Sequence, residues 1–540
     1  MGPMVSPVTE TRTWRPVIMG RAAVASNHPA ATQAGLDVLR RGGSAADAAV
    51  TISLCLGVAE PFMSGLGGDG FLHVHEGHSS VYEGTGAAPA AASLDLFGGV
   101  LPEDGPLSIS PPGLLAALGR MHRKHGRLPF QGLVAPAAEM ARVGTYVGHT
   151  YRRYAKSDKW RLNRSPDAVQ IYFDQGEVPG LGSKVINRKL AETLDEIGRS
   201  GVDEFYRGAL ARRIVTDLKA AGSIITDSDL RDVQAIGRDA ISAQYRGYEV
   251  LQTPPVSTGF VLLQELAILE QFPPKMLLEN PSLRIHVMIE AKKLSFLDRE
   301  KYGGDPSSVY LPVSSLLDPV RIANLADRIS LGKAADLPIH IGGSETNTTY
   351  FCAADDQGQV VSAIQSLNAP FGSGVFLAST GILMNNRMTC WHLDRDHPNA
   401  LMPKKRVRQT MNAPIILKDG LPWAALGTPG ADNQVQVNFQ AITSLIDLEL
   451  DPQQTAEAPR WSSDQPGQGA NWPHGGENTL VVEASFDPTI LQGLRDRGHS
   501  LKVVPGLEGP CSLEIIRILP DGTKLAGSDP RRDGWAAAIG

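Results

Sequence analysis

The segment ETNTTYFCAADDQGQVVSAIQSLN, residues 345–368, constrains the fold more than any other part of the chain. Two runs of apolar and β-branched residues flank a polar turn, so the pattern predicts a β-hairpin over 349–367. The hairpin begins at the pair Thr348-Thr349, directly after the small and polar residues 331–347. Two explanations fit this join: an ordinary surface loop, or a segment that is cut from the strand it precedes.

Thr348 can act as a catalytic group if the peptide bond before it is cut. Cleavage after Asn347 would leave a hydroxyl and a free α-amino group on one residue. The reference pKa of an α-amino group, about 7.7–8.0, lies close to neutral pH, so the amine can take the hydroxyl proton without a histidine. The threonine pair is therefore a candidate N-terminal nucleophile.

Composition excludes several classes of protein. The 540 residues give one large or two ordinary domains, and the net charge of −6 includes no long run of Lys or Arg, so neither nucleic acid nor an anionic membrane is an expected partner. The N-terminus lacks a basic segment followed by an apolar one, and no stretch is long and apolar enough to span a membrane, so the expected location is the cytoplasm. Small-molecule chemistry is the expected function.

Helical and strand patterns alternate along the chain. Residues 27–61 show two helical patterns separated by Gly42-Gly43, with Ser44 as the N-cap of the second. Periodicity predicts further helices at 108–145, 186–221 and 434–447. It predicts strands at 243–251, 349–367 and 412–427. The GLGGDG segment, residues 65–70, matches the glycine pattern of dinucleotide-binding turns, but a strand pattern follows it where such a turn needs a helix. We expect a tight turn whose backbone approaches a ligand or another strand.

No metal, disulfide or organic cofactor is expected. His73, His75 and His78 have a spacing that could ligate a metal, but the first two alternate on a short strand, so packed or solvated histidines are the better interpretation. The segment 394–397 is expected to be a charged loop rather than an acid/base pair. The cysteines are far apart, which favours reduced thiols: Cys55, Cys352, Cys390 and Cys511.

Short motifs spread over nearly the whole chain are NHPAATQAGLDVLRRGGSAADAAV, EPFMSGLGGDGF, YRGYEV, TPPVSTG, ETNTTY, LNAPFGSG, GILMNNRM, TPGAD and SDPRRDG. Together they resemble the γ-glutamyltransferase family of N-terminal-nucleophile hydrolases. The resemblance implies an α+β fold, a four-layer αββα sandwich, made as a precursor that cuts itself between Asn347 and Thr348. The products would be a large subunit, 1–347, and a small subunit, 348–540, of about 37 and 21 kDa by proportion of length. They would stay together as a heterodimer, and a higher oligomer is left open.

The resemblance also implies roles for individual residues. Thr348 would attack the carbonyl carbon of Asn347 during processing and later attack the substrate amide, forming an acyl-enzyme. Thr349 is expected on the opposite face of the strand, where it helps to orient the nucleophile. Ser366 and Asn368 match family positions that bond the nucleophile and the polar head of the substrate.

Gly430 and Ala431, in TPGAD, match the pair whose backbone amides form the oxyanion hole. Such donors typically lower the barrier by about 2.7–4 kcal/mol each. Alanine is compatible with this role if its backbone dihedral angles allow it.

The departures from the family pattern concern the substrate. Family members that act on glutathione hold the glutamyl α-carboxylate with an arginine where this chain has Thr85. They hold the α-amino group with a glutamine and an acidic residue where it has Arg387 and Cys390. A serine pair of the family is replaced by Gln409-Thr410. Because an ammonium group would face a cation here, the pocket is expected to hold an anion.

These departures resemble the family's non-glutamyl branches, which include oxamate amidohydrolases and cephalosporin acylases. The bulky pair Trp391-His392 is expected to shrink the pocket further. We favour a small carboxylate-bearing amide such as oxamate, with the carboxylate held by Arg387. The alternatives are a glutathione hydrolase or γ-glutamyltransferase, a cephalosporin-type acylase, and a non-processing binding protein. Arg387 could also be paired structurally with Asp394 or Asp396 and never meet substrate.

Overall fold

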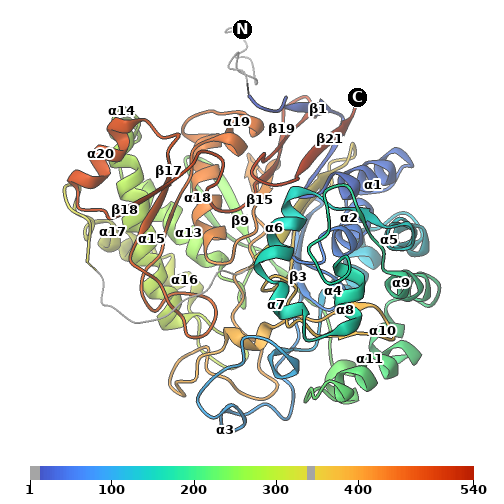
Figure 1. Cartoon of the computed structure of the whole chain (residues 1–540). Helices are drawn as coiled ribbons and strands as arrows, with labels where there is room; N and C mark the ends of the chain where they lie inside the picture. The colour runs from blue at the N-terminus through green and yellow to red at the C-terminus, as the bar shows by residue number, and fades with distance from the viewer. Residues whose placement is uncertain (1–12, 337–346) are drawn as a thin grey trace.

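Two seven-stranded sheets packed face to face form the centre of the molecule, and helices cover their outer faces (Figure 1). The computed structural model describes residues 13–336 and 347–540, without the side chain of Asn347. The first sheet contains, in spatial order, β1 (Ile18–Gly20), β20 (Lys524–Ser528), β19 (Glu514–Ile518), β15 (Leu421–Gly427), β14 (Ile415–Lys418), β9 (Tyr248–Gln252) and β8 (Ile241–Tyr245). The second contains β21 (Trp535–Ile539), β2 (Ala22–Ser26), β10 (Asn347–Ala354), β11 (Val360–Asn368), β3 (Asp69–His75), β4 (Ser79–Gly84) and β7 (Ile236–Asp239).

Strand β10 shows why the chain forms four layers. Successive side chains of a strand point to opposite faces, and both faces of β10 are apolar. Tyr350 and Cys352 belong to the core between the two sheets. Phe351 and Ala353 belong to the core between the second sheet and its helices. The predicted αββα sandwich is therefore the observed architecture, with one core between each pair of adjacent layers.

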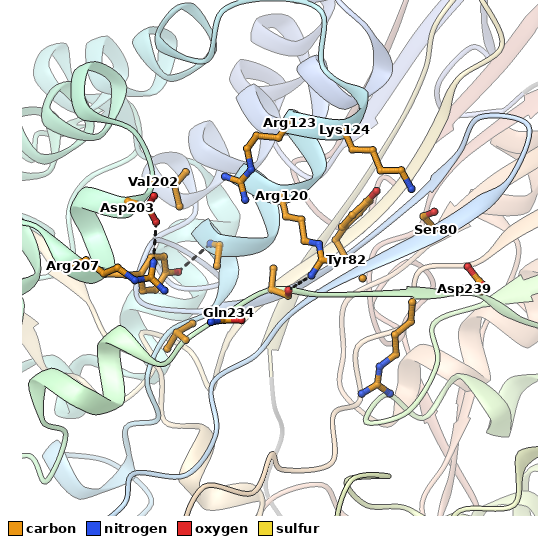
Figure 2. A pocket seen from close by; sticks show the side chains of 16 residues that line it. Ser80, Tyr82, Arg120, Arg123, Lys124, Val202, Asp203, Arg207, Gln234 and Asp239 are labelled. Atoms are coloured by element: carbon orange, nitrogen blue, oxygen red, sulfur yellow. Dashed lines mark hydrogen bonds and ion pairs between the residues drawn. The ribbon is translucent and has the colours of Figure 1, made fainter.

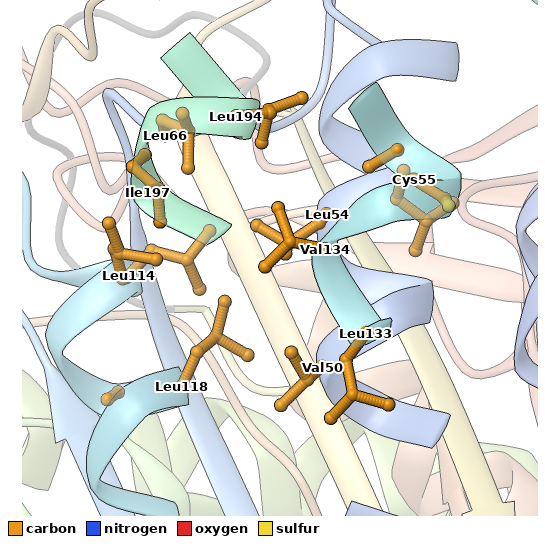
Figure 3. Packing of buried hydrophobic residues seen from close by; sticks show 14 of the residues in the cluster. Val50, Leu54, Cys55, Leu66, Leu114, Leu118, Leu133, Val134, Leu194 and Ile197 are labelled. Atoms are coloured by element: carbon orange, nitrogen blue, oxygen red, sulfur yellow. The ribbon is translucent and has the colours of Figure 1, made fainter. Parts of the chain in front are cut away.

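Helices rich in leucine and alanine cover the second sheet, and their packing is shown in Figure 3. They are α1 (Pro29–Arg40), α2 (Ala45–Ala59), α4 (Leu114–His125), α5 (Phe130–Val143) and α9 (Arg188–Ser200). The first sheet is covered by α13 (Gly259–Glu270), α15 (Pro281–Tyr302), α17 (Pro319–Ala326) and α18 (Asn433–Ile446). No helix in the described ranges is long and apolar enough to cross a bilayer.

The remaining elements lie outside the two large sheets, and most of them are short. The helices are α3 (Leu94–Phe97), α6 (His149–Ser157), α7 (Lys159–Leu162), α8 (Pro166–Tyr172), α10 (Asp203–Arg207), α11 (Ala209–Ala220), α12 (Asp227–Arg231), α14 (Pro274–Glu279), α16 (Val313–Leu316), α19 (Pro452–Glu457) and α20 (Pro488–Asp496). Two 3₁₀ turns are η1 (Pro106–Ser108) and η2 (Arg387–Cys390). The strands are β5 (Thr145–Tyr146), β6 (Lys184–Val185), β12 (Phe376–Leu377), β13 (Ile382–Leu383), β16 (Trp461–Ser463), β17 (Leu480–Glu483) and β18 (Leu501–Val504).

Most local predictions are confirmed. Ser44 caps α2 through a reciprocal capping box with Asp47. The segment 243–251 is not one strand: β8 and β9 form a hairpin, because Arg246 and Gly247 take positive φ values of 50° and 76° and reverse the chain.

The glycine turn at residues 65–70 lies against other strands. A Cβ atom on Gly67 would come within 2.1 Å of the Leu383 carbonyl oxygen, and one on Gly68 within 2.4 Å of the Ser366 carbonyl oxygen. Only glycine allows this approach.

The histidines near this turn are packed or solvated, as expected. His73 bonds the carbonyl of Ala413, and His78 pairs with Asp239 at the surface. All four cysteines are free and buried.

Candidate active site

Thr348 lies where the pairing of β10 and β11 is irregular. Asn347 pairs with Asn368, but Thr349 already pairs with Gln365, so Ser366 and Leu367 together face the single residue Thr348. Such a bulge re-aims side chains and is common beside active sites. Thr348 is 2% exposed, and its hydroxyl donates to the Ser366 hydroxyl at 3.3 Å.

Thr349 points away from this pair, as expected. Its hydroxyl donates to Glu60 Oε2 at 2.7 Å and accepts from Asn27 Nδ2 at 3.1 Å. Burial raises the pKa of Glu60 to about 7, while the hydrogen bond from Thr349 and the nearby Arg532 pull it down. No hydrogen bond joins the two threonine side chains among the described residues, so Thr349 can position Thr348 only through the backbone they share.

Asn368 is the centre of a buried polar cluster next to Ser366. Its backbone N–H donates to Ser366 Oγ at 2.7 Å, and its φ of 81° turns the chain out of β11. Its Oδ1 accepts from Arg387 Nη1 at 3.1 Å. Its Nδ2 faces the oxygens of Asn386, Thr389 and Asn471 at 3.0–3.3 Å.

Arg387 lies in the same cluster and is 2% exposed. Its Nε donates to Asp69 Oδ2 at 3.3 Å, so its ionic partner is neither Asp394 nor Asp396. Burial raises the pKa of Asp69 to about 6 even though Arg387 attracts the carboxylate form. Arg387 Nη2 is buried without a partner among the described residues. A buried guanidinium nitrogen with an unused donor is costly unless something binds it.

Gly430 and Ala431 form a tight turn before α18. Both have positive φ values, 113° and 49°, so the alanine at 431 takes a left-handed conformation as the glycine before it does. Their role as an oxyanion hole stays a prediction. Their carbonyls accept from the first amides of the helix, whereas neither of their own amides has a protein acceptor in the described part of the chain. A hydrogen-bond relay, Thr428–Ser512–Asn27, connects this turn with Thr349.

Comparisons with known proteins show the family to which the chain belongs. The family model for gamma-glutamyltranspeptidase matches residues 31–539. The chain belongs to the gamma-glutamyltranspeptidase family. It is 35% identical to the glutathione hydrolase-like YwrD proenzyme of Bacillus subtilis, over 97% of this chain and 99% of that one. It is 32% identical to the oxamate amidohydrolase proenzyme of Klebsiella pneumoniae, over 95% and 98%.

A solved structure extends this relationship to the fold. The cephalosporin acylase from Bacillus halodurans superposes with a TM-score of 0.87 at 30% identity, covering 99% of both chains. Membership of the gamma-glutamyltranspeptidase family makes this chain an N-terminal-nucleophile amidohydrolase or transferase.

The remaining predicted substrate residues lie outside the polar cluster around Asn368. We call this the Asn368 cluster, and its members are Asp69, Asn368, Asn386, Arg387, Thr389, Cys390 and Asn471. Thr85 donates to Glu83, which pairs with Arg406, so its hydroxyl is already used within the protein. Gln409 is fully buried, and neither atom of its amide has a partner among the described residues. Its neighbour Thr410 is half-buried. No hydrogen bond in the described ranges connects either residue to Arg387.

Three further residues of the site were not predicted from the sequence: Asn27, Glu60 and Asn471. The first two begin the motifs NHPAAT and EPF, so the motifs could have pointed to them. Asn471 lies in a loop without a recognisable motif, and only the structure brings it to Asn368.

Other candidate sites do not contain Thr348. The large cavity of about 710 Å³ in Figure 2 is lined by α4, α10 and β7 and contains Arg120, Arg123 and Lys124. Two groups of side chains have metal-ligand types and spacing: His286, Glu290 and His499, and Glu300, His392 and His397. Lys293 already binds Glu290, and Arg299 and Arg408 already bind Glu300. The absence of a metal from the reaction stays a prediction.

Proposed function

We propose that this chain is a self-processing amidohydrolase that uses Thr348 as its nucleophile and acts on a small amide carrying a carboxylate, such as oxamate. The observation that carries the substrate class is the buried Arg387, whose Nη2 has no partner among the described residues. A guanidinium binds carboxylates well. Cys390, whose pKa is raised by burial, supplies no negative charge for an ammonium group.

The proposed processing reaction uses the backbone around the bulge. The Thr348 hydroxyl loses its proton and attacks the carbonyl carbon of Asn347, the C–N bond breaks, and its nitrogen takes up a proton. Water then hydrolyses the ester and leaves the α-amine of Thr348 free. The Ser366 hydroxyl orients the nucleophile, and the amides of Gly430 and Ala431 stabilise the oxyanion.

The mature enzyme would repeat this chemistry on the substrate. The α-amine of Thr348 takes the hydroxyl proton, the hydroxyl oxygen attacks the substrate carbonyl, and the amine leaves with a proton. Water or an acceptor amine resolves the acyl-enzyme. In this proposal, Asn368 and Arg387 hold the head of the acyl group, with Gln409, Thr410 and Thr85 as outer candidates.

The two subunits, 1–347 and 348–540, should remain associated in the cytoplasm after the cut. In the second sheet, β10 and β11 of the small subunit lie between β2 and β3 of the large subunit. In the first sheet, β14 pairs with β9 across the same division. Separating the fragments would expose sheet edges and two cores.

The first test is the intact mass of the purified protein beside a Thr348→Ala variant. We expect two fragments in the wild type, the second beginning at Thr348, and one uncut chain in the variant. One uncut chain in both would reject the nucleophile and would favour the binding-protein alternative.

The second test compares substrates: oxamate, γ-glutamyl-p-nitroanilide and a cephalosporin amide. We expect the processed enzyme to release ammonia from oxamate. Strong release from the γ-glutamyl compound and none from oxamate would instead support a glutathione hydrolase, the activity in the name of the YwrD relative. Preference for the cephalosporin would support an acylase.

A further inference from the structure

The loop between β16 and β17, residues 464–479, is attached firmly to the rest of the protein. Two buried basic side chains of α15 hold its first half: Lys292 donates to Gln465 Oε1, and Arg299 donates to the carbonyl of Gln468. Further along, Trp472 N–H donates to the Thr389 carbonyl at 2.7 Å. These contacts place the 464–479 loop against the η2 turn that carries Arg387.

A stack of histidine rings holds the second half of the loop. The ring of His474 lies parallel to that of His392, with centroids 3.7 Å apart, and its Nε2 is 3.0 Å from the carbonyl oxygen of Trp391. His392 stacks in turn on His397. The pair Trp391-His392 therefore limits the pocket indirectly, by fixing the 464–479 loop.

The loop carries Asn471 into the Asn368 cluster, where it is 5% exposed. The orientation of both amides follows from Arg387, which can only donate. Arg387 Nη1 fixes Oδ1 of Asn368 toward itself, so Asn368 presents Nδ2 to Asn471, and Asn471 must present its oxygen. Cys390 Sγ also lies 3.0 Å from Asn471 Oδ1. Since burial raises the pKa of this thiol, it stays protonated and can donate.

This arrangement leaves the amide nitrogen of Asn471 unused. The contacts of the Asn471 amide with described residues go through Oδ1, and none is made by its Nδ2. Arg387 Nη2 is buried without a partner among these residues. The carboxylate of Asp69 already accepts from Arg387 and from the Gly113 amide. The cluster thus offers unused donors and no unused carboxylate, which suits an anionic group rich in acceptors and disfavours an ammonium group.

We propose that Asn471 is a specificity-determining residue that donates, together with Arg387, to the carboxylate of the acyl group. This inference rests on the proposed function, because it places the substrate head in the Asn368 cluster. The acyl donors it selects are short ones whose carboxylate lies next to the scissile amide, since Asn368 and the nucleophile Thr348 bond the same Ser366 hydroxyl. The residue acts by contact with substrate, and the loop anchors only position it.

Matched Asn→Asp substitutions in one loop test the proposal. Asn471→Asp keeps the shape and the accepting oxygen but replaces the NH₂ donor with a second oxygen and adds negative charge. Asn478→Asp is the control: Asn478 is exposed in the same loop, and its φ of 52° is one that aspartate also tolerates. Initial-rate kinetics on the full processed protein, or calorimetry where no turnover occurs, would measure the binding constants, KM or the dissociation constant, of oxamate and of its neutral analogue oxamide.

We expect Asn471→Asp to weaken oxamate binding at least tenfold, because a hydrogen bond to a charged group is lost and a repulsion is added. The affinity for oxamide should fall much less, so that the preference for oxamate over oxamide decreases. Asn478→Asp should keep both constants. A general folding defect would weaken both ligands equally and leave their ratio unchanged, and an unchanged ratio overturns the proposal.

The outcomes also separate this inference from the proposed function. A wild-type protein that neither cuts itself nor hydrolyses amides, yet binds oxamate through Asn471, would reject the function alone. A processed and active enzyme whose oxamate-to-oxamide preference ignores Asn471→Asp would reject the role of Asn471 alone. Failure of the wild type to bind oxamate would overturn the role of Asn471 as well.

Discussion

Replacing Arg387 by glutamine is the most informative single change in this site. Arg387 is 2% exposed and makes contacts of 3.3 Å with Asp69 and 3.1 Å with Asn368, while its Nη2 stays free among the described residues. Glutamine keeps a donor and an acceptor of similar reach but carries no charge. The variant therefore removes the positive charge that we assign to carboxylate binding and leaves Thr348 and its bulge untouched.

The expected loss follows from the interaction that disappears. A hydrogen bond to a charged group contributes about 1.5–3 kcal/mol, which corresponds to a fall of roughly 10- to 150-fold in kcat/KM. Because the carboxylate is held in the same way before and during the reaction, most of the loss should appear in KM. Self-cleavage should proceed as in the wild type.

The stability of this variant should depend on pH. In the wild type, burial raises the pKa of Asp69 to about 6, although Arg387 lowers it. The pKa of Asp69 should therefore rise further in the variant that lacks Arg387. A carboxyl with a raised pKa contributes stability that is lost as pH rises through the folded-state pKa. Since this window extends to higher pH in the variant, its deficit in melting temperature relative to the wild type should grow from pH 5 to pH 8.

Steady-state kinetics with oxamate, and mass spectrometry of the processed chain, would measure these effects. Arg395→Gln is the matched control, because its side chain is 74% exposed and its ion pair with the exposed Asp95 is 3.6 Å long. An Arg387→Gln enzyme with unchanged kcat/KM for oxamate would refute the assignment of the carboxylate site. A loss of the same size in Arg395→Gln would show that net charge, rather than this contact, matters.

Three further changes test the surroundings of the site. Gly430→Ala should lower kcat at least tenfold in an ester or amide assay, because the oxyanion turn has a φ of 113° and the new Cβ would lie 2.3 Å from the Cys511 sulfur; normal kcat would remove Gly430 from the oxyanion hole. Glu60→Gln should become more stable relative to the wild type as pH rises from 5 to 8, by up to about 3 kcal/mol, because the pKa of Glu60 is raised to about 7 and only the wild type must ionise a buried carboxyl. Urea titrations in which the two free energies of unfolding differ by the same amount at every pH would contradict this. Ser44→Ala removes a capping box and should lower the free energy of unfolding by about 1 kcal/mol, which calorimetry would record as a fall in melting temperature of about 1 °C. An unchanged melting temperature would show that the cap does not stabilise the protein.

Local features of the fold were predictable from neighbouring residues. The boundary between α1 and α2, the hairpin of β10 and β11 and the capping residue Ser44 depend on backbone hydrogen bonds over a few positions. The error at β8 and β9 has a local cause as well, since Arg246 takes a positive φ that its residue type seldom adopts. The position of Thr348 at the start of a strand was predictable in the same way.

The partners of the site residues were decided by the tertiary structure. Arg387 pairs with Asp69, 318 residues away, and not with the aspartates a few positions along the chain. Asn471 meets Asn368 because buried basic side chains and stacked histidines hold its loop against η2. The positions of strand ends and turns could be predicted from the sequence alone, because they depend on short-range backbone geometry. The partner of a buried charged side chain depends on how the four layers pack together, and no local sequence pattern encodes that packing.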